Sequence, residues 1–183
     1  GMNYGERNAG VGWKMVFSKL PRAFYSGDTI AVAHGLLGKF LVHRVDGVER
    51  VGMIVETEAY LGPHDLASHS SHGKTRRNAS MFGPVGHAYV YLIYGVHECI
   101  NVVAEKEGKG AAVLIRALEP VRNCAGRTNG PGLLTKAMGI TRARDGCDLL
   151  SDELCVARGA EAIAVRACKA RRIGVAYAGR WAA

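Results

Sequence analysis

Two glutamates at alternate positions, Glu56 and Glu58, are the first residues whose type and spacing suggest chemistry. They lie in a largely apolar stretch that runs from Val51 to Tyr60. A carboxylate in a partly buried strand is costly unless it is paired. Either glutamate could therefore be half of a structural salt bridge. Glu58 could also be a general base whose pKa the surrounding site would have to tune.

Tyrosines form a second group of candidate residues. Four of the seven in the chain are Tyr60, Tyr89, Tyr91 and Tyr94. A tyrosine in a strand usually serves sheet packing. Tyr94 differs because it adjoins Gly95 at a turn, where a large ring is poorly placed for a core and well placed to wedge between bases. Electron-rich rings also bind cationic ligands, and alkylated purines are ligands of this kind.

Three histidines, His64, His69 and His72, lie close together in the sequence, with Asp65 beside them. A metal-dependent hydrolase built on this cluster is one alternative, which metal analysis or the effect of EDTA decides. The spacing fits no standard pattern of metal ligands. We therefore expect no metal and no other cofactor.

Positive charge is in excess, with 24 Lys and Arg residues against 16 Asp and Glu residues and a net charge of +8. This excess favours a polyanionic partner, because each phosphate contact releases counterions. Arg76 and Arg77 stand in the basic run 74–78 and could contact phosphates beside the site. Arg116 ends an apolar strand, where a nearly buried arginine needs a carboxylate partner or a function.

The elements that must position these residues form a mixed α/β pattern with antiparallel pairing. Asp28 is a plausible N-cap for a helix over 29–37, and Gly38 a plausible stop. Alternation over 51–60 places Ile54, Glu56, Glu58 and Tyr60 on one face of a strand. Further strands are expected at 40–42, 88–94, 100–104, 112–118 and 162–167, a helix at 133–138, and a loop at 61–86 with a short helix around 64–70.

The chain of 183 residues suits one domain over 17–183, preceded by a flexible leader over 1–16. No apolar run is long enough to span a membrane, and the N-terminus lacks the apolar segment of a secretion signal. The five cysteines form no C-x-x-C pair, which indicates reduced thiols in the cytoplasm, associated with the nucleoid if the source is bacterial. We expect a monomer.

Several segments, taken in order and spacing over about residues 20–181, resemble the alkyladenine (3-methyladenine) DNA glycosylase family. The most specific are the run E-T-E-A-Y-L-G-P at 56–63 and the run Y-V-Y-L-I-Y-G at 89–95. Shorter matches are Ala67-Ser68-His69-Ser70, Arg77-Asn78, Met81-Phe82, Asn101, residues 114–120 and residues 130–133. The resemblance implies a single domain with a curved, mainly antiparallel sheet, surrounding helices and a protruding β-hairpin.

The resemblance also implies roles for individual residues. Glu58 resembles the family's general base, which activates water. Arg116 resembles a residue that helps to place this water, and the backbone carbonyl of Ile173 would lie near it. The base pocket would use Tyr60 and His69 as two faces that sandwich the flipped base, Tyr91 as the closing edge, and Asn101 to discriminate against the guanine 2-amino group. Tyr94 resembles the residue that fills the gap in the duplex, and Arg142 a basic DNA contact.

The implied activity is that of a monofunctional DNA glycosylase in base excision repair. Such an enzyme flips alkylated or deaminated purines, of the 3-methyladenine, 7-methylguanine or hypoxanthine type, out of double-stranded DNA and hydrolyses the N-glycosidic bond. No lysine in the motif segments stands out as a Schiff-base nucleophile, so we expect no lyase activity. The sequence departs from the family in a loop one residue shorter after His69, in Tyr177 where histidine is common, and in its end at Ala183, which bears on the region of Ile173.

Two further alternatives are open. A non-catalytic nucleic-acid binding module would keep the charge and the tyrosines but leave Glu58 without a role. A carbohydrate-acting glycosidase could use Glu56 and Glu58 as its pair, because alternate strand residues lie about 6.6–6.8 Å apart, near the separation of such carboxylates. Both glutamates belong to one strand, however, and do not flank a bond from two sides.

Overall fold

The computed structural model describes residues 17–65 and 67–159. The predicted leader 1–16, the predicted strand 162–167, Ile173 and Tyr177 lie outside the described residues. The strands are β1 (Phe17–Lys19), β2 (Phe40–Val45), β3 (Val48–Tyr60), β4 (Ala88–Ile93), β5 (His97–Val103), β6 (Ala112–Arg122) and β7 (Leu154–Gly159). The helices are α1 (Arg22–Tyr25), α2 (Thr29–Leu36) and α3 (Pro131–Met138), with 3-10 turns η1 (Ala79–Phe82) and η2 (Arg142–Arg144).

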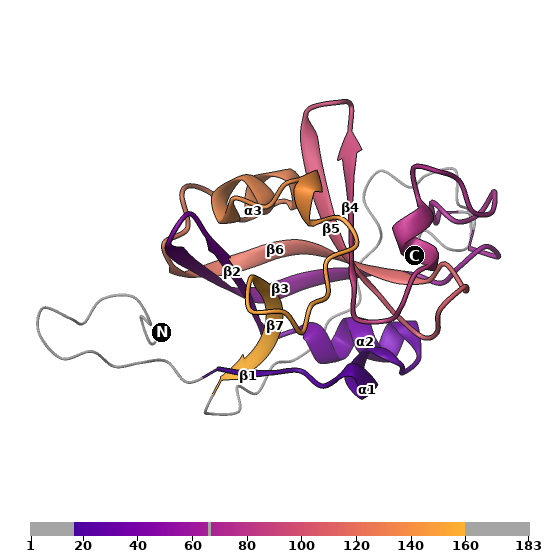
Figure 1. The fold of residues 1–183 in the computed structure, drawn as a ribbon, viewed down its shortest axis with the longest axis horizontal. Coiled ribbons are helices and arrows are strands. Elements are labelled where there is room, and N and C mark those ends of the chain that lie inside the picture. The colour runs from indigo at the N-terminus through magenta and orange to yellow at the C-terminus, as the bar shows by residue number, and fades with distance from the viewer. Residues whose placement is uncertain (1–16, 66, 160–183) are drawn as a thin grey trace, which may run out of the picture.

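The seven strands form one open sheet in the order β1-β7-β2-β3-β6-β5-β4, and every strand pair in it is antiparallel. The β4–β5 hairpin rises away from the rest of the sheet beside α3 (Figure 1). The predicted fold class, a mixed α/β domain with a curved antiparallel sheet and a protruding hairpin, is confirmed. In the described part of the chain, no helix combines the length and the apolar character that a membrane crossing requires.

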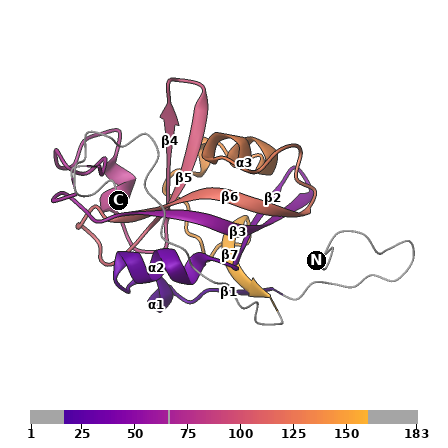
Figure 2. The same ribbon diagram turned by 180° about the vertical axis from the view of Figure 1, so that it is seen from behind.

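Two helices flank the centre of the sheet, with α2 on one side of β3 and β6 and α3 on the other, as both views agree (Figures 1 and 2). The α2 helix begins where the Asp28 carboxylate accepts a hydrogen bond from the Ala31 amide at 3.3 Å, as predicted. The α3 helix has Pro131 in its first turn and ends at Gly139, whose φ of 68° closes the last turn. Local capping signals therefore set both helices.

Buried apolar side chains form one main cluster and two smaller ones. The main cluster joins both helices to the sheet and includes Leu36, Ile54, Ile115, Leu134 and Met138. A second cluster lies at the base of the hairpin and contains Met81, Tyr89, Tyr91, Cys99, Val103, Ala112 and Leu114, with Tyr60 partly buried against it. This second cluster forms the floor of the sheet face on which the candidate site lies.

A bulge interrupts the pairing of β3 with β6 just before Glu58. The register shifts between Ile54 and Glu56 and again between Glu56 and Thr57, and an extra residue in one strand reverses the alternation of faces. Ile54 accordingly belongs to the main cluster, whereas Tyr60 packs on the second cluster and Thr57 bonds to a carbonyl of α2 at 3.0 Å. The prediction that Ile54 shares a face with Glu58 and Tyr60 is therefore wrong.

The segment between β3 and β4 consists mainly of turns. The Asp65 carboxylate accepts hydrogen bonds from the amides of Leu61 and Ala67, both at 3.0 Å, and Ser68 Oγ accepts one from the Ser70 amide at 3.2 Å. Side-chain bonds of this kind compete with helical backbone bonds. The predicted short helix around 64–70 is wrong for this reason, since the described residues there form turns.

Candidate active site

A buried carboxylate lies at the centre of the site. Glu58 on β3 is 9% exposed, and its Oε1 lies 2.8 Å from Nη1 of Arg116 on β6. The Tyr60 hydroxyl donates to the other oxygen, Oε2, at 2.8 Å. Glu56 is different, because its side chain is 59% exposed and lies 4.0 Å from Arg116 Nε. Of the two glutamates, only Glu58 is thus buried and held on both oxygens, which offsets the cost of burying its charge.

The sheet register aligns Glu58 with other residues of the predicted pocket. Glu58 pairs with Leu114, Leu114 with Asn101, and Asn101 with Tyr89, so one row crosses four strands. With strands about 4.8 Å apart, the backbone of Asn101 lies about 10 Å from that of Glu58 on the same face. Asn101 is 2% exposed, and its amide donates to the Tyr89 carbonyl at 3.2 Å. The row gives the pocket a continuous floor.

His69, Tyr89 and Tyr91 form an aromatic wall at the β4 end of this row. The His69 ring lies edge-to-face with Tyr91, with centroids 4.3 Å apart, and its Nδ1 lies 3.2 Å from the Tyr89 hydroxyl. Burial against these rings lowers the pKa of His69, and the positive charge of Arg77 lowers it further. Burial also raises the pKa of Tyr89 to about 12 and raises the pKa of Tyr91. The wall therefore carries no charge at neutral pH.

The tip of the hairpin presents an aromatic ring to solvent. Tyr94 is 91% exposed and has a φ of 51°, followed by Gly95 with a φ of 68°. A non-glycine residue in this left-handed region is strained, and such strain is concentrated at functional positions. The amide of Val96 bonds to the carbonyl of Ile93 at 3.1 Å and closes the turn. The turn holds the Tyr94 ring away from the sheet.

The hairpin is braced along β4, the edge strand of the sheet. Its outward backbone groups are bonded at four points. The Ala88 amide donates to Cys147 O, and the Ala88 carbonyl accepts from the Gly146 amide, each at 2.8 Å. The Val90 amide donates to Asp145 Oδ1 at 2.9 Å. Arg77 Nη2 donates to Leu92 O at 2.5 Å. These bonds fix the strand up to Leu92, two residues before Tyr94.

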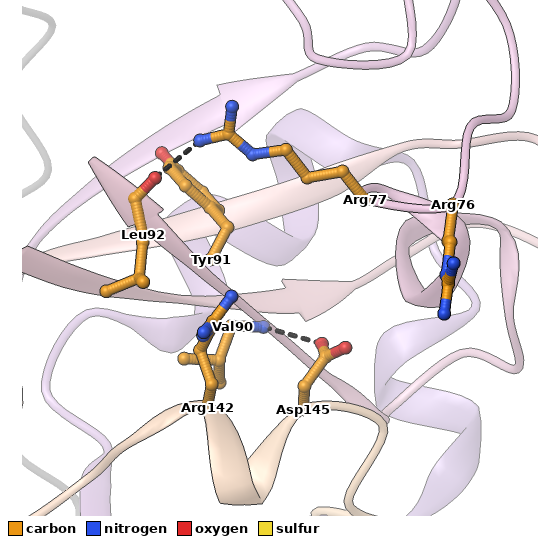
Figure 3. A pocket seen from close by; sticks show the side chains of 7 residues that line it. All are labelled: Arg76, Arg77, Val90, Tyr91, Leu92, Arg142 and Asp145. Carbon is orange, nitrogen blue, oxygen red and sulfur yellow. Dashed lines mark hydrogen bonds between the residues drawn. The ribbon is translucent and has the colours of Figure 1, made fainter. Parts of the chain in front are cut away.

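A hollow of about 580 Å³ lies along this edge, and all three arginines predicted to contact the DNA backbone line it (Figure 3). Its lining is Arg76, Arg77, Val90, Tyr91, Leu92, Arg142 and Asp145. Arg77 is engaged with Leu92, whereas the guanidinium groups of Arg76 and Arg142 have no hydrogen-bonding or ion-pairing partner among the described residues. Arg142 is far from Arg76 and Arg77 in the sequence, so the sequence alone did not indicate that the three line one hollow.

Two alternative arrangements are not found among the described residues. Residues 17–65 and 67–159 contain no group of three or more His, Cys, Asp or Glu side chains that could hold a metal ion, so His64, His69 and His72 do not make a ligand cluster there. Glu56 and Glu58 both approach Arg116 from one strand and do not face each other across a cleft. The carbonyl predicted to help place the water, that of Ile173, lies outside the described residues.

Sequence reasoning missed Tyr89, which belongs to the wall, and Asn78, which supports it. Tyr89 bonds to the His69 ring, and the side chain of Asn78 donates to the His69 carbonyl at 2.9 Å. Alternation with Tyr91 could have placed Tyr89 on the site face. The spacing of Thr75 and Asn78 could have indicated a local side-chain turn.

Comparison with known proteins adds to this geometry. A family model described as methylpurine-DNA glycosylase (MPG) matches residues 23–182. A protein from Legionella pneumophila is 57% identical over 164 residues, which are 90% of this chain and 90% of the relative. One from an Anaeromyxobacter species is 56% identical over 165 residues (90% of this chain, 84% of the relative), and one from Myxococcus xanthus is 51% identical over 166 residues (90% and 86%). All three carry the name "Putative 3-methyladenine DNA glycosylase".

Proposed function

Because this chain belongs to the methylpurine-DNA glycosylase family, a class of hydrolases that act on N-glycosyl bonds, we propose that it is a monofunctional DNA glycosylase of base excision repair. It would flip alkylated or deaminated purines out of double-stranded DNA and cut them from the sugar. One observation carries the proposal. Glu58 is buried and held by Arg116 and Tyr60, on the face that the His69–Tyr91 wall borders.

In the proposed reaction, Glu58 acts toward water. Each carboxylate oxygen has a second lone pair beyond the bond to Arg116 or Tyr60, so a water can still be bound. As the water attacks C1′ of the deoxyribose, its proton passes to Glu58, and the electron pair of the glycosidic bond leaves with the base. The carboxylate also stabilises the oxocarbenium-like transition state. Arg116 fixes the orientation of the carboxylate throughout.

The base would lie between Tyr60 and His69, with Tyr91 at its edge. An uncharged aromatic wall attracts a cationic ring through the quadrupoles of its rings and adds no repulsion, which supports 3-methyladenine and 7-methylguanine as substrates. Hypoxanthine is neutral and would gain less from this wall. Asn101, in the row that starts at Glu58, would discriminate against the guanine 2-amino group.

The DNA would be held by the hairpin and its edge. Tyr94 would fill the gap left by the flipped nucleotide. Arg76, Arg77 and Arg142 would contact the backbone, and the open guanidinium groups of Arg76 and Arg142 support this role most directly. We further propose that the protein acts as a monomer in the cytoplasm. The four free thiols among the described residues support the reducing compartment.

The test is excision from duplexes that carry a single 3-methyladenine, 7-methylguanine or hypoxanthine. Glu58→Gln is expected to bind the lesion duplex but to lose at least about a hundredfold in single-turnover excision. Glu56→Gln is the matched control, because Glu56 is exposed on the same strand and is expected to stay within about threefold of the wild type. Near-normal excision by Glu58→Gln would overturn the assignment.

The same assay separates the alternatives. A wild-type protein that binds the lesion duplex but releases no base would be a non-catalytic binding module. Loss of excision in EDTA would indicate the metal-dependent hydrolase. A covalent enzyme–DNA adduct trapped by borohydride would contradict the absence of lyase activity.

A further inference from the structure

Asn78, which the proposed mechanism does not use, is a buried polar residue beside the pocket. It is 3% exposed. Its Nδ2 donates to His69 O at 2.9 Å and to Gly73 O at 3.1 Å, and its Oδ1 accepts from the Thr75 amide at 2.6 Å. Both donors and the acceptor of the amide are thus in use. A buried amide with all its bonds made specifies one local conformation.

His69 is bonded directly to this amide, while its neighbours Ser68 and Ser70 are buried and bonded to each other. The residue lies in a segment of turns and is itself exposed. Its ring is held at Nδ1 by the Tyr89 hydroxyl. Its backbone carbonyl is held by Asn78. The two contacts grip His69 at opposite ends and together set the ring against Tyr91.

We propose that Asn78 is a positioning residue for base recognition, which acts through His69 by fixing the carbonyl of that residue so that its ring stays in the aromatic wall. The inference rests on the proposed function, in which His69 is one face of the base pocket. Asn78 does not touch the base itself. Its contribution consists in keeping one face of the pocket preformed before the base enters.

The neighbouring residue extends the same support to the hairpin. Arg77 directs its guanidinium to Leu92 O, two residues before Tyr94 (Figure 3). Adjacent residues therefore hold the pocket wall on one side and the edge of the hairpin on the other. A shift of this dipeptide would displace the pocket relative to the wedge.

The decisive test is a double-mutant cycle between Asn78→Asp and His69→Ala. Aspartate keeps the acceptor toward Thr75 but loses both N–H donors, including the one to His69. Single-turnover release of 3-methyladenine from dimethyl sulfate-treated duplex DNA is the readout. Asn78→Asp alone is expected to slow release by about 10- to 100-fold, because a buried carbonyl loses its donor. In the His69→Ala background the same change is expected to cost less than about twofold.

Two further variants serve as controls for this test. Asn78→Ala removes the amide without burying a new carboxylate and is expected to follow the same pattern. Thr75→Val is the matched control. It removes the Thr75 hydroxyl, which accepts a hydrogen bond from the backbone N–H of Asn78 at 3.3 Å, and it leaves the bonds of the Asn78 side chain intact. It is expected to stay within about threefold of the wild type. Thermal unfolding of each variant reports on the fold.

The outcomes separate the two ideas. If Asn78→Asp costs as much without the His69 ring as with it, Asn78 does not act through His69 and the inference is wrong. Unfolding of both Asn78 variants would show that the residue serves the fold as a whole, which also overturns it. If the wild type releases no methylpurine at all, the proposed function itself fails and this inference falls with it.

Discussion

Replacing Arg116 by methionine is expected to destabilise the protein through the carboxylate that it leaves behind. The Glu58 side chain is 8% exposed, the Arg116 side chain 20%, and the pair is 2.8 Å apart. Removing one partner of a fully buried pair costs about 3–5 kcal/mol. Here Arg116 reaches solvent and the Tyr60 hydroxyl still holds Glu58 at 2.8 Å. We therefore expect a loss of about 2–3 kcal/mol in the free energy of unfolding.

Urea denaturation measures this loss as a lower midpoint at an unchanged slope. For a chain of this size the Tm should fall by about 4–12 °C. The double variant Glu58→Gln/Arg116→Met removes the unpaired charge and should regain at least about 1 kcal/mol over Arg116→Met. The control is Arg122→Met on the same strand, whose ion pair with Glu49 is more exposed and should be worth less than about 1 kcal/mol. Equal losses for the two arginine variants, or no gain in the double variant, would refute the reasoning.

Three further predictions follow from other parts of the molecule. Tyr94→Ala should lower affinity for a lesion duplex by at least about fivefold more than affinity for undamaged DNA, because base stacking on an aromatic ring is worth about 1–3 kcal/mol; equal losses in a binding titration would contradict the wedge. Arg76→Ala/Arg142→Ala should reduce the slope of log affinity against log salt by about 1.8, or about 0.9 for each phosphate contact, and an unchanged slope would remove these arginines from the DNA interface. Burial lowers the pKa of His43 below its ordinary value, so its stabilising effect is present above about pH 6.5 and is lost as pH falls through the lower folded-state value. Urea denaturation between pH 7.5 and 5 should therefore show a smaller loss of stability for His43→Gln than for the wild type.

The elements that the sequence predicts correctly are those with local signals. The α2 helix begins at its predicted cap, Asp28. Strand β7 was missed because its first four residues are all buried, so the polar and apolar alternation of a half-buried strand is absent. The bulge between Ile54 and Glu56 was missed for a different reason, since a register shift depends on the partner strand.

The site follows the same division. The contact of Tyr60 with Glu58 comes from spacing along one strand and could be anticipated. The partner of Arg116 could not be chosen from the sequence, because Glu56 and Glu58 were both available and burial decides between them. Asn78 could not be predicted as a support for His69, because its contacts depend on how a segment of turns closes on itself.

The bracing of β4 has a mechanical consequence. From Ala88 to Leu92 the outer edge of the hairpin is bonded to residues 145–147, which follow η2, and to Arg77, and its inner edge pairs with β5. Beyond the last outer bond, at Leu92, the hairpin consists of the Ile93–His97 pair and the turn from Tyr94 to Val96. The arm that carries the Tyr94 ring is therefore short, and a short arm bends little under load. In the proposed complex, the tendency of the DNA to re-stack would press on the Tyr94 ring. The short hairpin would transmit this force to the sheet and would bend little.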